Sequence, residues 1–242
     1  MVQVPQRTAL SGPALIRLLA RLTDLDVAES SQSLSDRLSQ WLGWTDAIGL
    51  STALNGSPPV VAAGARGFGS AEEDECARVR AALVTSIAGD SASGRTNRRG
   101  PAAVPVQVEV DYAVFRQRYL SLQQAMETRI GNLRGRLRAM LAARTTSMAR
   151  LAVVDAVMER ALSPRERSLL ASVPGMLAGH FERLRLAEQA ALADAGSTGT
   201  AAAVTPGAWL DAFSKDMQSV LLAELDVRFQ PVEGLLAALR TR

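Results

Sequence analysis

The chain has 242 residues with a formal net charge of +3, and 48% of the residues are hydrophobic. Alanine and leucine are the most frequent residues, whereas aromatic residues make up only 4%. Alanine and leucine favour helices, while sheets need β-branched and aromatic runs, so the composition excludes an all-β sandwich and argues against a βαβ enzyme. The hydrophobic fraction also excludes global disorder.

Charge is distributed unevenly along the chain. Every basic residue except Lys215 is an arginine, and arginines far outnumber acidic residues between positions 95 and 167, so the centre is basic and the ends are acidic. The single cysteine, Cys76, excludes an intramolecular disulfide and a cysteine-based zinc site. Its acidic neighbours, residues 72–75, are expected to raise the pKa of the thiol.

Neither a secretion signal nor a membrane span is predicted. Arg17 and Arg21 interrupt the apolar run between Leu15 and Leu22, and a signal peptide needs an uninterrupted apolar core. No stretch approaches the ~18 uncharged apolar residues that suggest a transmembrane helix. We therefore expect a cytoplasmic protein.

Residues 1–90 are predicted to form a small N-terminal helical part. Caps and leucine spacing predict one helix from Pro13 to Leu22. A second begins near Ser33 and runs toward Leu54, weakened by two glycines, and a third spans Ser70 to Gly89 with acidic residues in its first turn. Residues 91–105 lack apolar periodicity and are predicted to be a flexible linker.

The segment 106–195 is predicted to be a long helical hairpin. Apolar residues recur every three or four positions from Glu109 to Leu162 with no proline, which is typical of one coiled-coil helix. The sequence Ser163-Pro164-Arg165-Glu166 resembles a capping box, so the chain is expected to turn at 162–163 and return antiparallel. Pro174-Gly175 must kink or divide the returning helix.

A second linker, residues 196–204, precedes C-terminal amphipathic helices over residues 205–242. Thr205-Pro206 predicts the start of the last helix, which is expected to bend or end before Pro231. The predicted fold class is therefore all-α, with an extended helical hairpin or coiled coil, a small N-terminal helical part and a C-terminal amphipathic helix.

An arginine-rich stretch within the long helix is the main candidate for anion binding. Its candidate residues border or oppose the predicted apolar stripe: Arg129, Arg134, Arg136, Arg138 and Arg150. Three interpretations stay open. The arginines could flank a coiled-coil seam and pair with neighbours, bind an acidic partner such as the acidic ends of this chain, or bind nucleic acid. The stretch lacks the interleaved aromatic residues that stack on bases.

Aromatic residues on short amphipathic stretches are the candidates for partner binding. Trp41 and Trp44 lie within four residues of each other, and Trp209 and Phe213 share one face of the last predicted helix. Aromatic residues at such positions are either local core or anchors for a partner. The apolar faces of these helices predict self-association or a protein partner.

No residues indicate catalysis, cofactor binding or metal binding. The one histidine, His180, has no second ligand beside it, and residues 72–75 point in different directions on a helix, so they cannot share one ion. Ser91 follows Gly89-Asp90 as in some serine hydrolases, but no strand–turn–helix context accompanies it. We expect a protein without enzymatic activity, cofactor or small-molecule substrate.

Two blocks of the sequence resemble a known family. The first consists of RTALSGPALIRLLARLTDLDV and LSDRLSQWLGWTDAIGLSTAL, and the second of VFRQRYLSLQQAMETRIGNLRGRLR and LSPRERSLLASVPGMLAGHFERL. Together they resemble a family of uncharacterised beta-proteobacterial proteins known only as a domain of unknown function. The resemblance covers nearly the whole chain and implies an association with an envelope complex, but it brings no catalytic residues.

The sequence thus predicts a non-enzymatic cytoplasmic adaptor or assembly component that acts through coiled-coil and amphipathic helix surfaces. The alternative is a helical nucleic-acid-binding protein that uses the arginine-rich stretch 129–150. Phosphate contacts would make the affinity of the alternative fall steeply with salt.

Overall fold

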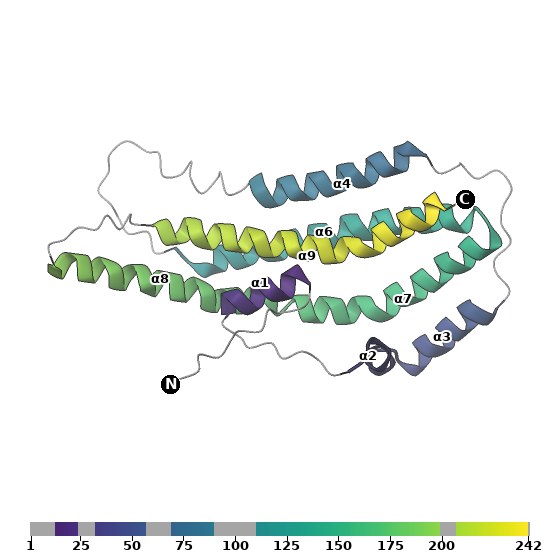
Figure 1. Ribbon diagram of the computed structural model, residues 1–242, viewed down its shortest axis with the longest axis horizontal. Helices are drawn as coiled ribbons and strands as arrows, with labels where there is room; N and C mark the ends of the chain where they lie inside the picture. Colours follow the sequence, from purple (N-terminus) through teal and green to yellow (C-terminus); the bar gives the residue numbers. More distant parts are fainter. Residues whose placement is uncertain (1–12, 24–31, 57–68, 90–109, 199–206, 242) are drawn as a thin grey trace, which may run out of the picture. The chain divides into compact units, whose positions relative to one another are not determined.

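The computed structural model describes residues 13–23, 32–56, 69–89, 110–198 and 207–241, and all regular structure in these ranges is helical (Figure 1). The predicted all-α class is confirmed for this part of the chain. The chain separates into two compact units: unit 1 comprises residues 1–31 and 176–227, and unit 2 comprises residues 32–175 and 228–242. The units therefore do not follow the domain boundaries expected from the sequence.

Unit 1 is held together by leucines and a cluster of aromatic rings. It contains α1 (Ala14–Thr23), α8 (Val173–Thr198) from residue 176 onward, and α9 (Ala208–Arg240) up to residue 227. The Phe181 ring meets the edges of Trp209 and Phe213, with ring centroids 4.8 and 5.1 Å apart. Arg183 donates a hydrogen bond to the carbonyl of Leu22, which satisfies an otherwise unpaired carbonyl at the end of α1.

The centre of unit 2 is an antiparallel pair of helices, α6 (Tyr112–Ala142) and α7 (Thr146–Leu170). The prediction of one continuous helix from residue 109 to residue 162 is wrong, because the chain breaks at residues 143–145. The Thr145 hydroxyl accepts a hydrogen bond from the backbone N–H of Met148 at 3.3 Å and so caps α7. Hydroxyl side chains offer the backbone such local partners, and here they begin a new helix.

The turn expected at residues 162–163 does not occur. Pro164 lies inside α7, which continues to Leu170, so the predicted return of the chain after residue 162 is wrong. A proline in a helix removes one backbone hydrogen bond, at a cost of about 3 kcal/mol. Val157 and Leu170 are buried on either side of the proline, and this burial keeps the helix continuous. The chain does divide close to Pro174, since α8 begins at Val173.

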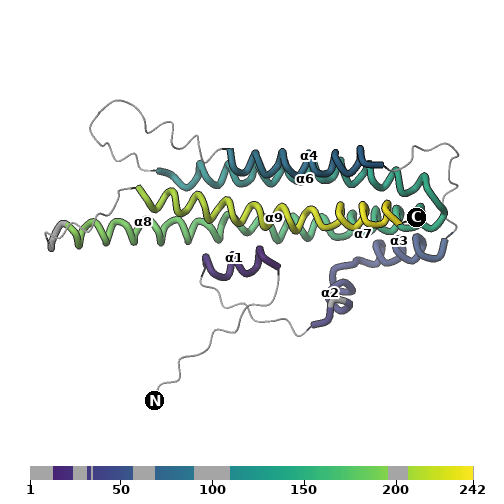
Figure 2. The backbone as a smooth tube through the Cα atoms, turned by 45° about the horizontal axis from the view of Figure 1, so that its top comes forward, coloured from purple at the N-terminus to yellow at the C-terminus, as the bar shows by residue number. Residues whose placement is uncertain are grey.

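Short helices cover the α6–α7 pair. α4 (Ser70–Gly89) packs along α6, and α2 (Leu34–Trp41) and α3 (Trp44–Asn55) pack on α7 (Figure 2). The bounds of α4 agree with the helix predicted over Ser70–Gly89, whereas the single helix predicted from Ser33 toward Leu54 is two helices, α2 and α3, divided at Gly43. Residues 91–105 lie outside the described residues, whereas α8 continues through Thr198 into the expected linker 196–204.

Residues 228–240 of α9 complete unit 2. Arg80 of α4 pairs with Glu233 at 2.7 Å, and Arg240 pairs with Glu73 of α4, also at 2.7 Å. Arg144, in the turn between α6 and α7, donates to the carbonyl of Leu239. α9 passes through Pro231 to Arg240, so of the two outcomes expected for this helix, a bend or an end before the proline, the end does not occur.

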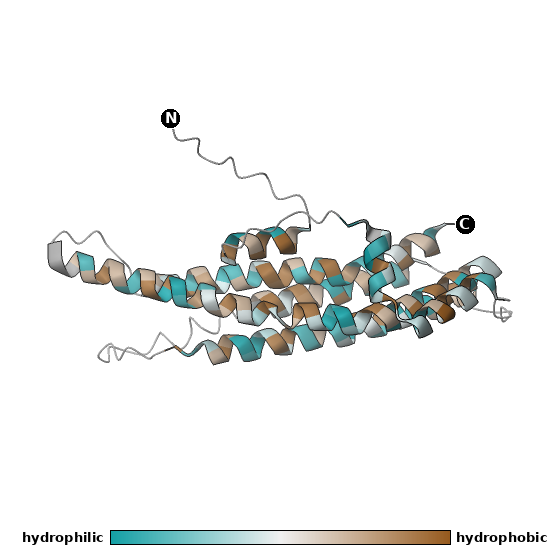
Figure 3. Cartoon of the chain, turned by 90° about the horizontal axis from the view of Figure 1, so that it is seen from below, coloured by the Kyte–Doolittle hydropathy of each residue, from teal (hydrophilic) through white to brown (hydrophobic). Residues whose placement is uncertain are grey.

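Apolar and polar residues alternate along the helices. Figure 3 shows hydrophilic residues interrupting the hydrophobic ones on each helix. Among the described residues, no helix combines the length and the apolar character needed to cross a membrane.

Candidate interaction surface

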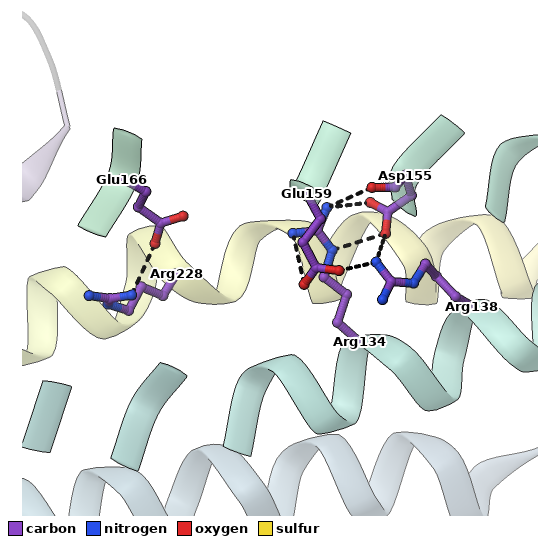
Figure 4. Close-up of polar contacts among 6 residues, drawn as sticks. All are labelled: Arg134, Arg138, Asp155, Glu159, Glu166 and Arg228. Carbon is purple, nitrogen blue, oxygen red and sulfur yellow. Dashed lines mark hydrogen bonds and ion pairs between the residues drawn. The ribbon is translucent and has the colours of Figure 1, made fainter. Parts of the chain in front are cut away.

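Four charged side chains form an ion-pair cluster between α6 and α7. Arg134 holds Asp155 with two hydrogen bonds, from Nε to Oδ2 at 2.9 Å and from Nη2 to Oδ1 at 2.6 Å (Figure 4). Arg138 donates to Asp155 Oδ2 at 3.3 Å and also pairs with Glu159. Both pairs of residues are spaced i, i+4, so each pair lies on one face of its helix. The four side chains are only 13–25% exposed.

Other predicted anion-binding residues also have partners within unit 2. Arg136 pairs with Glu75 of α4 at 2.6 Å, and this hydrogen bond lowers the pKa of the Glu75 carboxyl. Arg150 Nη2 donates to the carbonyl of Gly56 at 3.4 Å, at the end of α3. Arg129 is exposed on α6. The geometry thus agrees with the interpretation that the arginines border a helix seam and pair with carboxylates of this chain.

A further ion pair connects α7 to the last segment of α9. Arg228 Nη1 contacts Glu166 Oε1 at 3.2 Å, and the Arg228 side chain is only 7% exposed (Figure 4). Glu166 is the acidic residue of the predicted capping box. Because α7 does not begin at Ser163, the Glu166 carboxylate does not cap a helix start and pairs with Arg228 of α9 instead.

The predicted partner-binding aromatic residues have different environments. Phe213 is fully buried and Trp209 packs against Phe181, so both contribute to the core of unit 1. A role of Phe213 as a surface anchor does not fit this burial. Trp41 is half-buried under the guanidinium of Arg165, whose carbon lies 5.6 Å from the ring centroid. Trp44, in contrast, is 82% exposed.

Trp44 begins an outward apolar surface on α3. We call Trp44, Ile48 and Leu54 the α3 outer face; Ile48 and Leu54 are about half exposed. The opposite side of α3 carries Gly49 and Ala53 and packs on α7. Three of the four large apolar residues of α3 are thus exposed, and only Leu50 is half-buried, whereas an amphipathic helix usually buries such residues.

Gly49 shows how closely α3 approaches α7. A Cβ atom at this position would lie 3.6 Å from Val157 Cγ1 and 3.1 Å from Arg160 Nη2. The sequence pattern predicts Gly49 only as a weak point of the helix and does not identify Ile48 and Leu54 as surface residues. The i, i+4 spacing of Gly49 and Ala53 could have indicated that the inner side carries the small residues.

Other reactive groups have structural surroundings. His180 Nε2 lies 2.8 Å from Asp216 Oδ2 and joins α8 to α9 within unit 1. Cys76 is buried in α4, and burial raises the pKa of its thiol. Within the described residues, no group of three or more histidine, cysteine or acidic residues could hold a metal ion. Ser91 lies outside those residues.

These features define a class: an all-helical protein whose arginines are largely paired internally and whose exposed apolar residues include one outward helix face. The chain belongs to the family described as protein of unknown function (DUF3348), whose model matches residues 1–241. This match confirms the resemblance to a domain of unknown function. Comparison with curated proteins and with solved structures gave no match.

Proposed function

We propose that this protein is a non-enzymatic adaptor or assembly component that binds a protein partner through helix surfaces. The observation that carries the proposal is the α3 outer face. A single exposed apolar residue is ordinary on a protein surface, but Trp44, Ile48 and Leu54 share one side of a 12-residue helix. An exposed apolar patch that includes tryptophan is typical of a protein–protein contact.

The orientation of α3 supports this proposal. If α3 served only to cover α7, its large apolar residues would face inward, because their burial stabilises the fold. Gly49 and Ala53 take inward positions instead, and of the four large apolar residues only Leu50 is half-buried, so Trp44, Ile48 and Leu54 are left for another surface to cover.

The ion pairs weigh against the nucleic-acid alternative. A phosphate that approached Arg134, Arg136 or Arg138 would have to displace a carboxylate already bound at 2.6–3.3 Å. Arg134 and Arg138 are moreover largely covered by protein, so a nucleic-acid backbone has little access to them.

Site-specific photo-crosslinking in the native cell tests the proposal. A photoreactive amino acid replaces Ile48, and Val114 serves as the matched control because it is also apolar, helical and 68% exposed. We expect protein crosslinks from position 48 and none from position 114. Crosslinks to nucleic acid, no crosslinks at position 48, or equal crosslinks at both positions would overturn the proposal.

A further inference from the structure

We infer that α4 is a displaceable cover, which opens away from α6 and α9 while the rest of unit 2 stays folded. The surface that α4 leaves then binds an acidic amphipathic helix of a partner protein. This surface lies apart from the α3 outer face, because α4 packs on α6 whereas α3 packs on α7. Its role therefore goes beyond the function proposed above.

α4 buries few apolar side chains for its length. Of its 20 residues, the buried ones are Cys76, Leu83 and Ile87, whose spacing places them on one side of the helix. α6, in contrast, buries apolar residues in every turn from Tyr119 to Leu141. Segments with few buried apolar contacts open at a lower free energy than the core on which they lie. We therefore expect α4 to open before α6 and α7 separate.

Exposed ion pairs connect α4 to its neighbours. α4 pairs with α6 through Glu75–Arg136 at 2.6 Å, and with α9 through Glu73–Arg240 and Arg80–Glu233, both at 2.7 Å. The six side chains are 31–59% exposed. Pairs at such exposure contribute little to stability, and salt screens them. Sodium chloride should therefore loosen the contacts of α4 more than those of the ion-pair cluster between α6 and α7, which is largely covered.

α4 itself shows which kind of helix this surface accepts. On one side of its buried stripe, Glu75 pairs with Arg136 of α6. On the other side, Glu73 pairs with Arg240 of α9. An arginine of α4 also covers the Phe229 ring of α9, with its guanidinium carbon 5.4 Å from the ring centroid. The opened surface is thus apolar between two arginines, which matches an apolar helix face flanked by carboxylates.

Cys76 reports the opening of α4, because its thiol is buried and the chain has no other cysteine. The measurement is the rate at which a thiol reagent labels the native full chain, divided by the rate for the same thiol in the urea-unfolded chain. We expect this relative rate to rise with sodium chloride. Below the unfolding transition it should depend only weakly on urea, since opening α4 exposes less surface than unfolding the whole unit.

A thiol in α7 provides the reference. Ala152→Cys in a Cys76→Ala chain places it at a position that is 5% exposed, close to the 3% of Cys76. Ala149, which is also buried in α7, is the second choice if the first variant does not fold. The reference thiol should have a lower relative rate and the steeper urea dependence of global unfolding. Equal rates and equal urea dependence at the two positions would overturn the inference.

Arginine variants test the ion pairs without changing the sequence of α4 around the reporting thiol. Arg136→Gln combined with Arg240→Gln should raise the relative labelling rate about three- to tenfold, as expected for the loss of two exposed pairs. Arg167→Gln is the matched control, because Arg167 pairs with Glu127 at similar exposure and neither residue lies on α4 or α9. The control should be labelled like wild type. No rise in the double variant, or an equal rise in the control, would contradict the opening of α4 as a separate element.

A peptide of residues 69–89 with Cys76→Ala is the probe for the partner's helix. Added in excess to the full chain, it should bind the surface that α4 leaves and raise the labelling rate several-fold, because it traps the open state. The control peptide additionally carries Glu73→Gln and Glu75→Gln and should raise the rate less. If neither peptide raises the rate, or if both raise it equally, an acidic helix is the wrong occupant and the inference falls.

Discussion

Replacing Asp155 with asparagine would break the central contact of the ion-pair cluster. Asp155 accepts hydrogen bonds from both Arg134 and Arg138, whereas Glu159 pairs with Arg138 and lies 3.7 Å from Arg134. The asparagine keeps the shape of the side chain but removes its charge. Two guanidiniums, both largely covered by protein, would then share one carboxylate.

The expected cost follows from the burial of these groups. Breaking a fully buried ion pair costs about 3–5 kcal/mol, whereas an exposed pair contributes about 0–1 kcal/mol. The Arg134 and Asp155 side chains are 13% and 15% exposed, which lies closer to the buried case. Because Glu159 still compensates part of the charge, we expect Asp155→Asn to lower the free energy of unfolding by about 2–3 kcal/mol.

Urea denaturation followed by circular dichroism measures this cost, with Glu233→Gln as the control. Glu233 also pairs with an arginine on another helix, at 2.7 Å, but the two side chains are 40% and 54% exposed. The control should lose less than about 1 kcal/mol, and added salt should reduce that loss further. Equal losses in the two variants would refute the assignment of a special role to the cluster.

A double replacement distinguishes the contribution of the ion pair to the free energy of unfolding from the contribution of side-chain packing. Arg134→Met with Asp155→Leu removes both members of the closest pair and leaves Arg138 to pair with Glu159. Because apolar residues of similar size often replace a buried pair without loss, the double variant should be more stable than Asp155→Asn alone. A double variant that is less stable would show that the charges themselves stabilise unit 2.

Three further predictions concern single residues. Burial raises the pKa of Tyr112 from 10 to about 12. The free energy of unfolding should therefore fall between these pH values, because the unfolded state loses the phenol proton first. Urea titrations should show a fall of at most ~2 kcal/mol, since the ring is only partly covered, and Tyr112→Phe should remove it. Cys76 should react with a thiol reagent slowly in the native protein and quickly in urea, because burial raises its pKa; a native rate equal to that of free cysteine would contradict this. Gly49→Leu should overpack α3 against α7 and lower the free energy of unfolding by about 1–3 kcal/mol in thermal or urea denaturation. Gly131→Ala is the control: the new Cβ atom meets open space, so the free energy of unfolding should rise by up to about 1 kcal/mol.

Features that depend on neighbouring residues were predictable from the sequence. The helix from Ser70 to Gly89 has the predicted ends because its acidic first turn and its terminal glycine are local signals. The division near Pro174 and the all-α class likewise depend on local composition. For the same reason, the pairing of arginines with carboxylates could be expected as one interpretation of the arginine-rich stretch.

Features that depend on tertiary contacts were not predictable in the same way. The proline at position 164 gave a strong local signal for a helix start, but buried residues on both sides of it keep α7 continuous. The choice of Asp155 as the partner of Arg134 depends on the turn at residues 143–145, from which the two residues lie almost equally far along the chain. With the turn placed at residue 162, no pattern in the sequence could bring them together.

The interleaved make-up of the two units affects the order in which the protein can fold during synthesis. Residues 32–175 leave the ribosome before residues 228–240, which bury Val232, Leu235 and Leu239 in unit 2. All of residues 176–227, which belong to unit 1, must be translated in between. At a translation rate of roughly 5–20 residues per second, the apolar surface of unit 2 that residues 228–240 later cover stays exposed for seconds on the nascent chain. During this interval a chaperone has its best opportunity to bind. Because each unit consists of two separate stretches of the chain, neither unit can be expressed as one uninterrupted fragment.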